Sequence, residues 1–189
     1  MSATTLAPTL VRRSGLVAEA TMVLSGLALL AVSAYVVIPL WFTPVPLTGQ
    51  TFAVLLVGGA LGATRGLLTV ALYLAIGALG APVFAEGASG LSGPTAGYLV
   101  GMLVAAWLVG RAAERGWDRR LVPCVLAMLA GHVAIYLFGL TWLAMTLKTG
   151  LWDTLALGAA PFVLGDLLKV ALAAGLLPSA WAVVRRVRD

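Results

Sequence analysis

Apolar residues form six runs along the chain, and short polar or glycine- and proline-rich segments separate them. A helical run of roughly 20 apolar residues matches the hydrocarbon thickness of a bilayer. The pattern therefore predicts an all-α integral membrane protein with six transmembrane helices. We expect these helices at residues 16–40, 51–61, 67–79, 94–109, 121–143 and 160–184.

The second and third runs are shorter than an isolated span requires. Residues 41–50 precede them and read WFTPVPLTGQ, in which Pro44 and Pro46 exclude regular helix. Irregular backbone at membrane depth is tolerated only where protein buries it or where it lines a cavity. We therefore expect this segment to dip into the protein beside two short helices, which a tight turn at residues 62–66 connects.

Composition also indicates a membrane protein. Of the 189 residues, 61% are hydrophobic and only 10% are charged, whereas soluble domains average about 25% charged residues. The first run is too long for the apolar region of a cleaved signal peptide, which has about 7 to 15 residues. Because six spans leave little room for anything else, we expect a single membrane domain. It comprises a cytoplasmic tail at 1–15, a six-helix bundle at 16–184 and a basic cytoplasmic tail at 185–189.

Basic residues gather at one set of predicted helix ends, and only Lys148 lies at the other. Positive charge marks the cytoplasmic side of membrane proteins. Both termini are therefore expected in the cytoplasm, with the loops at 41–50, 80–93 and 144–157 outside. The net charge of +5 is accounted for by this asymmetry and by contact with anionic lipid, so it indicates no nucleic-acid partner. The residues at the basic ends are Arg12, Arg13, Arg65, Arg111, Arg115, Arg119, Arg120, Arg185, Arg186 and Arg188.

Asp166 and Lys169 interrupt the last apolar run. Residues three apart project from one face of a helix, and ionisable groups inside a membrane face a cavity or each other. The helix enters from outside near Ala160, which places the two charges roughly 9 to 14 Å below that end. One interpretation is an internal ion pair that neutralises itself. The other is a polar site for a small ligand in an outward-facing pocket.

The outer loops supply side chains that suit such a pocket, because ligand pockets combine apolar walls with a few polar groups. The polar candidates are Thr43, Thr48, Gln50, Thr51, Glu86, Ser89 and Ser92. The aromatic candidates for its walls, several of which also suit the membrane interface, are Trp41, Phe42, Phe84, Tyr98, Trp142 and Phe162.

Other chemistry has little support in the sequence. His132 has no Asp, Cys or second His at metal-ligand spacing, so we interpret it as a hydrogen-bond partner between helices. The lone Cys124 is expected to pack in the core. The glycines of GGALG at 58–62 lack the Lys and Ser or Thr of a phosphate-binding loop. We therefore expect no enzyme activity, no metal and no cofactor.

Four segments carry a resemblance to a known family. They are VPLTGQTFAVLLVGGALG (45–62), GAPVFAEGASGLSGPTAGYLVG (80–101), GLTWL (139–143) and PFVLGDLLK (161–169). In order and spacing they resemble the BioY family, the biotin-specific substrate-binding (S) components of energy-coupling-factor (ECF) transporters. The resemblance extends from about residue 18 to residue 178. It implies a multi-pass protein of the bacterial cytoplasmic membrane that binds biotin from outside and works with a coupling subunit and two ATPases.

Biotin chemistry is compatible with the candidate residues. Asp166 is suited to accept hydrogen bonds from the ureido N–H groups, and Lys169 to donate to the ureido carbonyl or pair with the carboxylate. Which end of biotin Lys169 contacts stays open. Tyr98 and Phe162 are candidates for packing on the rings, and Gln50 and Thr48 for orienting the ligand. The full set of expected binding residues is Asp166, Lys169, Gln50, Thr48, Tyr98, Phe84, Glu86 and Phe162.

The sequence departs from the family at two places. S components of this type commonly dock the coupling subunit through an Ala-xxx-Ala spacing on the first helix, and that spacing is absent between residues 15 and 35. Ser14 with Ala18 and Thr21 with Ser25 keep a small-xxx-small spacing that permits close helix approach, so we expect docking there. The fourth helix begins GPTAGY where the family usually has GPTGGY, which adds one methyl group.

Two classes of function stay open on sequence alone. The first is a vitamin-binding membrane subunit, for biotin or another small vitamin. The second is an intramembrane enzyme or a self-sufficient secondary transporter that uses Asp166 and Lys169 for proton coupling. The motif match favours the first class. A homo-oligomer is compatible with the sequence.

Overall fold

The computed structural model describes residues 5–11 and 15–188, with side chains up to residue 186. Among these described residues, four helices are long and apolar enough to cross a membrane: α2 (Leu16–Ala34), α5 (Ala96–Ala113), α6 (Leu121–Leu147) and α8 (Val163–Arg188). Two shorter apolar helices, α3 (Gln50–Leu61) and α4 (Ala63–Ala78), lie between α2 and α5 in the chain. Each of the six predicted runs therefore corresponds to one helix.

The first helix is shorter than predicted. Helix α2 ends at Ala34, and the chain then forms a hairpin in which β1 (Val37–Ile38) pairs antiparallel with β2 (Leu47–Thr48). The prediction of helix as far as residue 40 was wrong because β-branched side chains favour extended backbone, and a proline disfavours helix in the residue before it. The hairpin accounts for the irregular segment expected at 41–50.

Only one residue, Gly62, separates α3 from α4. Its φ of +87° lies in a region that suits glycine, and the Ala63 N–H donates to Glu114 Oε1 at 2.9 Å as the new helix begins. The turn predicted at 62–66 was therefore too wide. Arg65 lies within α4 instead, where its Nη2 donates to Glu19 Oε1 of α2 at 2.7 Å.

Several segments expected as tails or loops are helical. A short helix, α1 (Leu6–Leu10), lies in the expected N-terminal tail, and its Leu6 is buried. Helix α7 (Leu151–Gly158) occupies most of the expected outer loop at 144–157. Helix α8 continues through the expected basic tail to Arg188, whereas α5 begins at Ala96, two residues after the predicted start.

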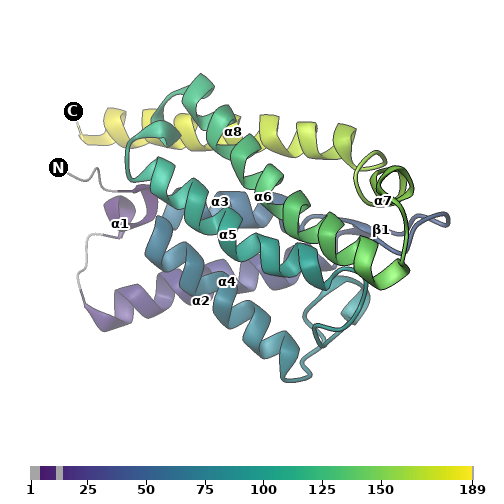
Figure 1. The fold of residues 1–189 in the computed structure, drawn as a ribbon. Coiled ribbons are helices and arrows are strands. Elements are labelled where there is room, and N and C mark those ends of the chain that lie inside the picture. The colour runs from purple at the N-terminus through teal and green to yellow at the C-terminus, as the bar shows by residue number, and fades with distance from the viewer. Residues whose placement is uncertain (1–4, 12–14, 189) are drawn as a thin grey trace.

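Helix α5 lies in the middle of the bundle, between α6 on one side and α3 and α4 on the other (Figure 1). Small residues allow these close approaches. A methyl group on Gly101 would lie 2.8 Å from Cα of Ile135 on α6, and one on Gly58 would lie 2.7 Å from the carbonyl oxygen of Ala106 on α5. Glycine therefore sets the helix spacing at both faces of α5.

The two ends of the molecule differ in character. Helix α1 and the C-terminal end of α8 lie at one end, and the hairpin and α7 lie at the other (Figure 1). The first end also holds the loop between α5 and α6, where η2 (Trp117–Arg119) lies. Lys148, by contrast, follows α6 at the hairpin end. Within the described part of the chain, the arginines therefore gather at the end opposite the hairpin.

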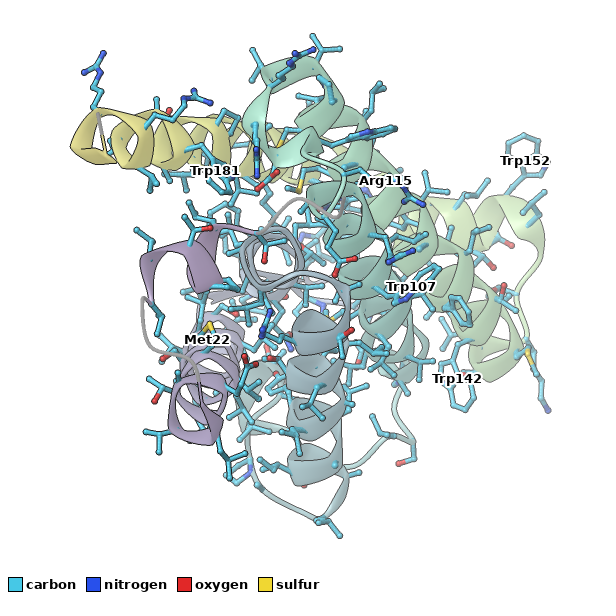
Figure 2. The ribbon with its side chains drawn as sticks, turned by 90° about the vertical axis from the view of Figure 1, so that its left-hand side faces the viewer. Met22, Trp107, Arg115, Trp142, Trp152 and Trp181 are labelled. Atoms are coloured by element: carbon cyan, nitrogen blue, oxygen red, sulfur yellow. The ribbon has the colours of Figure 1, made fainter. Side chains whose placement is uncertain are left out.

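A buried acidic group joins η2 to α8. Asp118 is 3% exposed, and its Oδ2 accepts a hydrogen bond from the indole N–H of Trp181. Figure 2 labels Trp181 beside α8. The guanidinium of Arg119 lies 4.3 Å from the centroid of the Trp181 ring. Burial raises the pKa of Asp118, although the Trp181 hydrogen bond and the charge of Arg119 oppose that shift. This cluster fixes the C-terminal half of α8 against the bundle.

Candidate functional site

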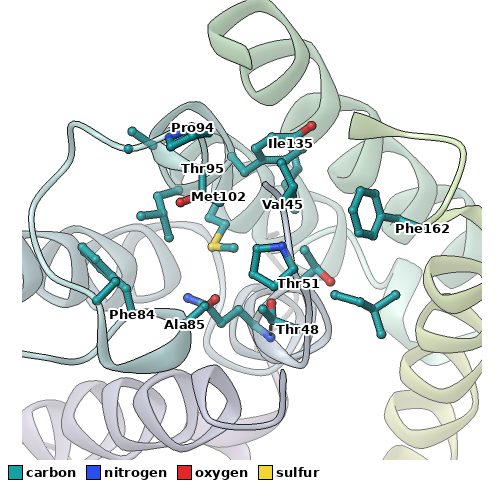
Figure 3. Close-up of a pocket in the computed structure, with 18 of the residues that line it drawn as sticks. Val45, Thr48, Thr51, Phe84, Ala85, Pro94, Thr95, Met102, Ile135 and Phe162 are labelled. Atoms are coloured by element: carbon teal, nitrogen blue, oxygen red, sulfur yellow. Dashed lines mark hydrogen bonds between the residues drawn. The ribbon is translucent and has the colours of Figure 1, made fainter. Parts of the chain in front are cut away.

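A cavity of about 270 Å³ opens among the hairpin segment, the loop before α5, and helices α5, α6 and α8. Figure 3 shows Val45, Phe84, Met102, Ile135 and Phe162 around it. All five side chains are buried, and they belong to segments far apart in the sequence. The cavity therefore has largely apolar walls, as ligand pockets generally do.

Asp166 and Lys169 reach this cavity from α8. Asp166 is 8% exposed, and its Oδ1 accepts a hydrogen bond from Lys169 Nζ at 3.0 Å. The same Nζ donates to Thr51 Oγ1 on α3 at 2.9 Å, and Tyr136 on α6 donates its hydroxyl to Asp166 Oδ2. The two charges therefore form a buried ion pair that three helices hold in place.

His132 lies on the same side of the cavity. It is 5% exposed, and its Nε2 is 3.4 Å from Asp166 Oδ1. Sequence reasoning interpreted His132 only as a hydrogen-bond partner between helices and did not select Tyr136. The available signal was their spacing, because residues four apart lie on one face of a helix, and both are polar within an apolar run.

A chain of hydrogen bonds fixes the side chain of Gln50 at the start of α3. The Gln50 Nε2 donates to the Tyr73 hydroxyl at 2.7 Å, and that hydroxyl donates to the carbonyl of Val83 at 2.7 Å. Gln50 is 3% exposed. The Thr48 Oγ1 accepts from the Gln50 N–H at 3.4 Å. Gln50 is thus held by its amide nitrogen, which leaves its carbonyl oxygen available to a ligand.

The aromatic walls are also fixed by specific contacts. The Tyr98 hydroxyl donates to the carbonyl of Gly158 at 2.8 Å, which ties α5 to α7. Phe84 packs edge-on against Tyr73 with ring centroids 5.3 Å apart. Glu86 lies in η1 (Ala85–Gly87) with a positive φ of 58° and is exposed. It therefore lines the mouth of the cavity rather than its interior.

The structure brings all eight predicted binding residues to this one cavity, and their contact with a ligand stays a prediction. Thr51, another polar candidate, also lines the cavity, whereas several other candidates lie outside it. Thr43 donates to the carbonyl of Leu157, Trp41 is 96% exposed, and the Trp142 indole donates to the carbonyl of Gly93. The lining residues that sequence reasoning did not select include Thr95, Met102, Ile135, His132 and Tyr136.

The predicted docking residues on α2 differ in their exposure. Ser14 lies outside the described residues. Ala18 is 9% exposed, whereas Thr21 and Ser25 are exposed. Thr21 and Ser25 are therefore the accessible members of the set, and docking through these residues stays a prediction. Among the described residues, no three His, Cys, Asp or Glu side chains lie close enough to hold a metal ion.

The model of the BioY family matches residues 4–186. The chain belongs to the BioY family. The Rhizobium etli protein named Biotin transporter BioY is 37% identical over 147 residues, which cover 72% of this chain and 78% of that protein. The Thermotoga maritima protein of the same name is 39% identical over 150 residues, covering 78% and 86%.

A solved structure supports the same assignment for this BioY-family chain. The S-component for biotin from an ECF-type ABC transporter superimposes with a TM-score of 0.74 at 26% sequence identity, and the match covers 91% of each chain. The family resemblance identified from the four sequence segments is therefore confirmed.

Proposed function

We propose that this chain binds biotin from outside the cell and takes it up as the S component of an ECF-type transporter. The observation that carries the proposal is the buried pair of Asp166 and Lys169 at the wall of a largely apolar cavity. An apolar ligand with a few strong hydrogen-bonding groups matches this lining. Biotin has that composition, because its rings and thioether are apolar and its ureido and carboxylate groups are polar.

Membrane topology follows from the helix lengths and the charges. Helix α3 has 12 residues and is about 18 Å long, so it crosses a bilayer only together with the hairpin that precedes it. We infer six spans in the bacterial cytoplasmic membrane, with the arginine-rich end in the cytoplasm. Both termini then lie inside, and the cavity mouth, beside the hairpin and α7, faces outward.

Energy for uptake is proposed to come from partner subunits. The glycines of α3 lack the residues of a phosphate-binding loop, so ATP hydrolysis is assigned to two ATPases that act through a membrane coupling subunit. Thr21 and Ser25 lie on an exposed face of α2, where short side chains permit close approach of another helix. This face is the proposed contact with the coupling subunit.

Calorimetric titration of the purified protein with biotin tests the binding function. We expect saturable binding without nucleotide or added ion, at one biotin per chain. Binding of a different vitamin in place of biotin would instead assign the chain to another substrate. Titration with thiamine and riboflavin under the same conditions provides that comparison.

A further inference from the structure

The mouth of the cavity carries one carboxylate whose charge the fold leaves unbalanced. Glu86 is exposed and lines the cavity from η1, and it forms no salt bridge with any described side chain. The other Asp, Glu, Lys or Arg side chains of the lining are Asp166 and Lys169, which pair with each other. Because the charges of that pair cancel, the charge that remains is negative and lies at the mouth.

A closed turn fixes the position of Glu86. The Gly87 N–H donates to the carbonyl of Phe84 at 3.1 Å, and the Phe84 N–H donates to the carbonyl of Ala88 at 3.1 Å. Phe84 is 3% exposed and packs against Tyr73, so the base of the turn is buried. Glu86 itself has a φ of 58°, which side chains other than glycine rarely adopt. Such conformations concentrate at ligand-binding sites, and here one holds a carboxylate beside the cavity.

The buried pair disfavours a second carboxylate at the inner wall. A ligand carboxylate there would lie beside Asp166, which is a like charge in buried surroundings. Lys169 offers little compensation, because its Nζ already donates to Asp166 and to Thr51. We therefore expect the charged end of biotin at the mouth, where water solvates it and Glu86 repels it.

The mouth also has room for a ligand longer than biotin. Gly90 and Gly93 line the cavity, and a Cβ atom added to either would meet no atom within 4 Å. Ala85 and Ala88 line it as well and have small side chains. A group attached beyond the carboxyl carbon of biotin therefore has space to extend outward. An amide of biotin carries such a group and has lost the negative charge.

We propose that Glu86 selects ligands by the charge of their outward end, and that amides of biotin with a neutral or positively charged tail belong to the ligand class of this chain. The inference rests on the proposed function, because it takes biotin as the parent ligand. Glu86 then acts as a specificity residue through its electric field, which a cleft focuses and which salt screens.

The test combines three ligands with three charges at the outward end. They are biotin, its primary amide, and biotin joined through an amide to a diamine, which are negative, neutral and positive at neutral pH. The variants are Glu86→Gln, which removes the charge, and Glu86→Lys, which reverses it. Asp153→Asn is the matched control, because Asp153 is exposed on α7 at the same end of the molecule and does not line the cavity. Calorimetric titration of each combination gives Kd.

We expect the wild-type protein to bind all three ligands. At low ionic strength, Glu86→Gln should strengthen biotin binding about threefold, weaken binding of the positive amide about threefold and leave the neutral amide unchanged, since charges at an exposed rim have modest effects. Glu86→Lys should enlarge both changes, and Asp153→Asn should cause neither. In about 1 M salt, where the Debye length is about 3 Å, the changes should disappear.

Three results would overturn the inference. In the first, Glu86→Gln shifts all three Kd values equally or shifts none, so that ligand charge has no part in the effect. In the second, the wild-type protein binds biotin but neither amide. In the third, salt fails to strengthen wild-type binding of biotin relative to the positive amide. The last two results need no variant to fold. A wild-type protein that binds none of the three ligands would refute the proposed function instead, so the two failures are distinguishable.

Discussion

The Asp166 carboxylate accepts hydrogen bonds from side chains on α6 and α8. Tyr136 and Lys169 donate to its two oxygens, and Lys169 also reaches Thr51 on α3. An ion pair buried in this way depends on both partners, because removal of one leaves an uncompensated charge. Ligand affinity is therefore expected to depend on the whole arrangement.

Replacing Lys169 tests this dependence. We expect Lys169→Ala to weaken biotin binding by roughly 2 to 5 kcal/mol, since it leaves Asp166 buried without its cation. Lys148→Asn is the matched control. It removes the cation at the same end of the molecule, where Lys148 is exposed with a φ of 53° that Asn tolerates. Equal affinities for wild type and Lys169→Ala in calorimetry would favour the interpretation of the pair as purely structural.

Two substitutions of Asp166 separate its charge from its hydrogen bonds. Asp166→Asn retains one acceptor oxygen for Tyr136 or Lys169, whereas Asp166→Ala retains none. Biotin affinity should therefore fall less in Asp166→Asn than in Asp166→Ala. The two variants are compared by the same titration, after thermal unfolding shows that both are folded. The reverse order would contradict the assigned role of these hydrogen bonds.

The candidate site could largely be predicted at the residue scale. Asp166 and Lys169 stand out because charges are rare in an apolar run, and the other six predicted residues reach the same cavity. The importance of His132 and Tyr136 could not be deduced in the same way. It depends on how α6 packs against α8, which the pattern of a single helix does not determine.

The helices themselves follow from the apolar runs, but their ends do not. Where a run crossed into extended backbone, as at Val37 and Ile38, hydropathy alone predicted helix. Helix α7 was missed because Asp153 and Thr154 interrupt the apolar pattern, and α1 because five residues are too few to show a period. Local backbone preference and tertiary contact decide these boundaries.

The exposed face of α2 has a consequence for assembly. We expect Thr21→Leu and Ser25→Leu each to abolish co-purification with the coupling subunit, because a larger side chain prevents close helix contact. Biotin affinity should not change. Thr141→Leu is a matched control, since Thr141 on α6 is also exposed and bonds to the carbonyl four residues earlier, as Thr21 does. Retention of the partner by both α2 variants would place the contact elsewhere.

At the scale of the whole molecule, stability should depend on the protonation of Asp118. Burial raises its pKa above the ordinary 3.8, so the folded chain binds this proton more tightly than the unfolded chain. The stability that this group contributes is therefore greatest at low pH and is lost as pH rises from 3.8 through the folded-state pKa.

Asp118→Asn imitates the protonated acid and retains an acceptor for Trp181. We expect it to raise Tm at neutral pH, by about 2–4 °C for each 1 kcal/mol, and to lose this advantage as the pH falls. Asp153→Asn controls for the loss of surface charge, because Asp153 is exposed. An advantage of Asp118→Asn that does not change with pH would contradict the assigned cause.

An uptake assay in vesicles tests whether this chain needs its proposed partner subunits for transport. In vesicles that contain only this chain, we expect biotin to bind without accumulating against a gradient. Accumulation should appear when the coupling subunit, both ATPases and ATP are added. If the chain alone concentrates biotin, it is a self-sufficient transporter and the partner requirement is wrong.

The single-residue connection at Gly62 restricts the insertions and deletions that this chain can tolerate. A side chain there would meet Glu114 Oε1 at 3.0 Å and would have to adopt a φ of +87°. Length changes in membrane proteins are absorbed in loops, and between α3 and α4 there is no loop to absorb them. Insertions and chain breaks are therefore unsuited to this connection, and α3 and α4 are best kept together as one indivisible unit.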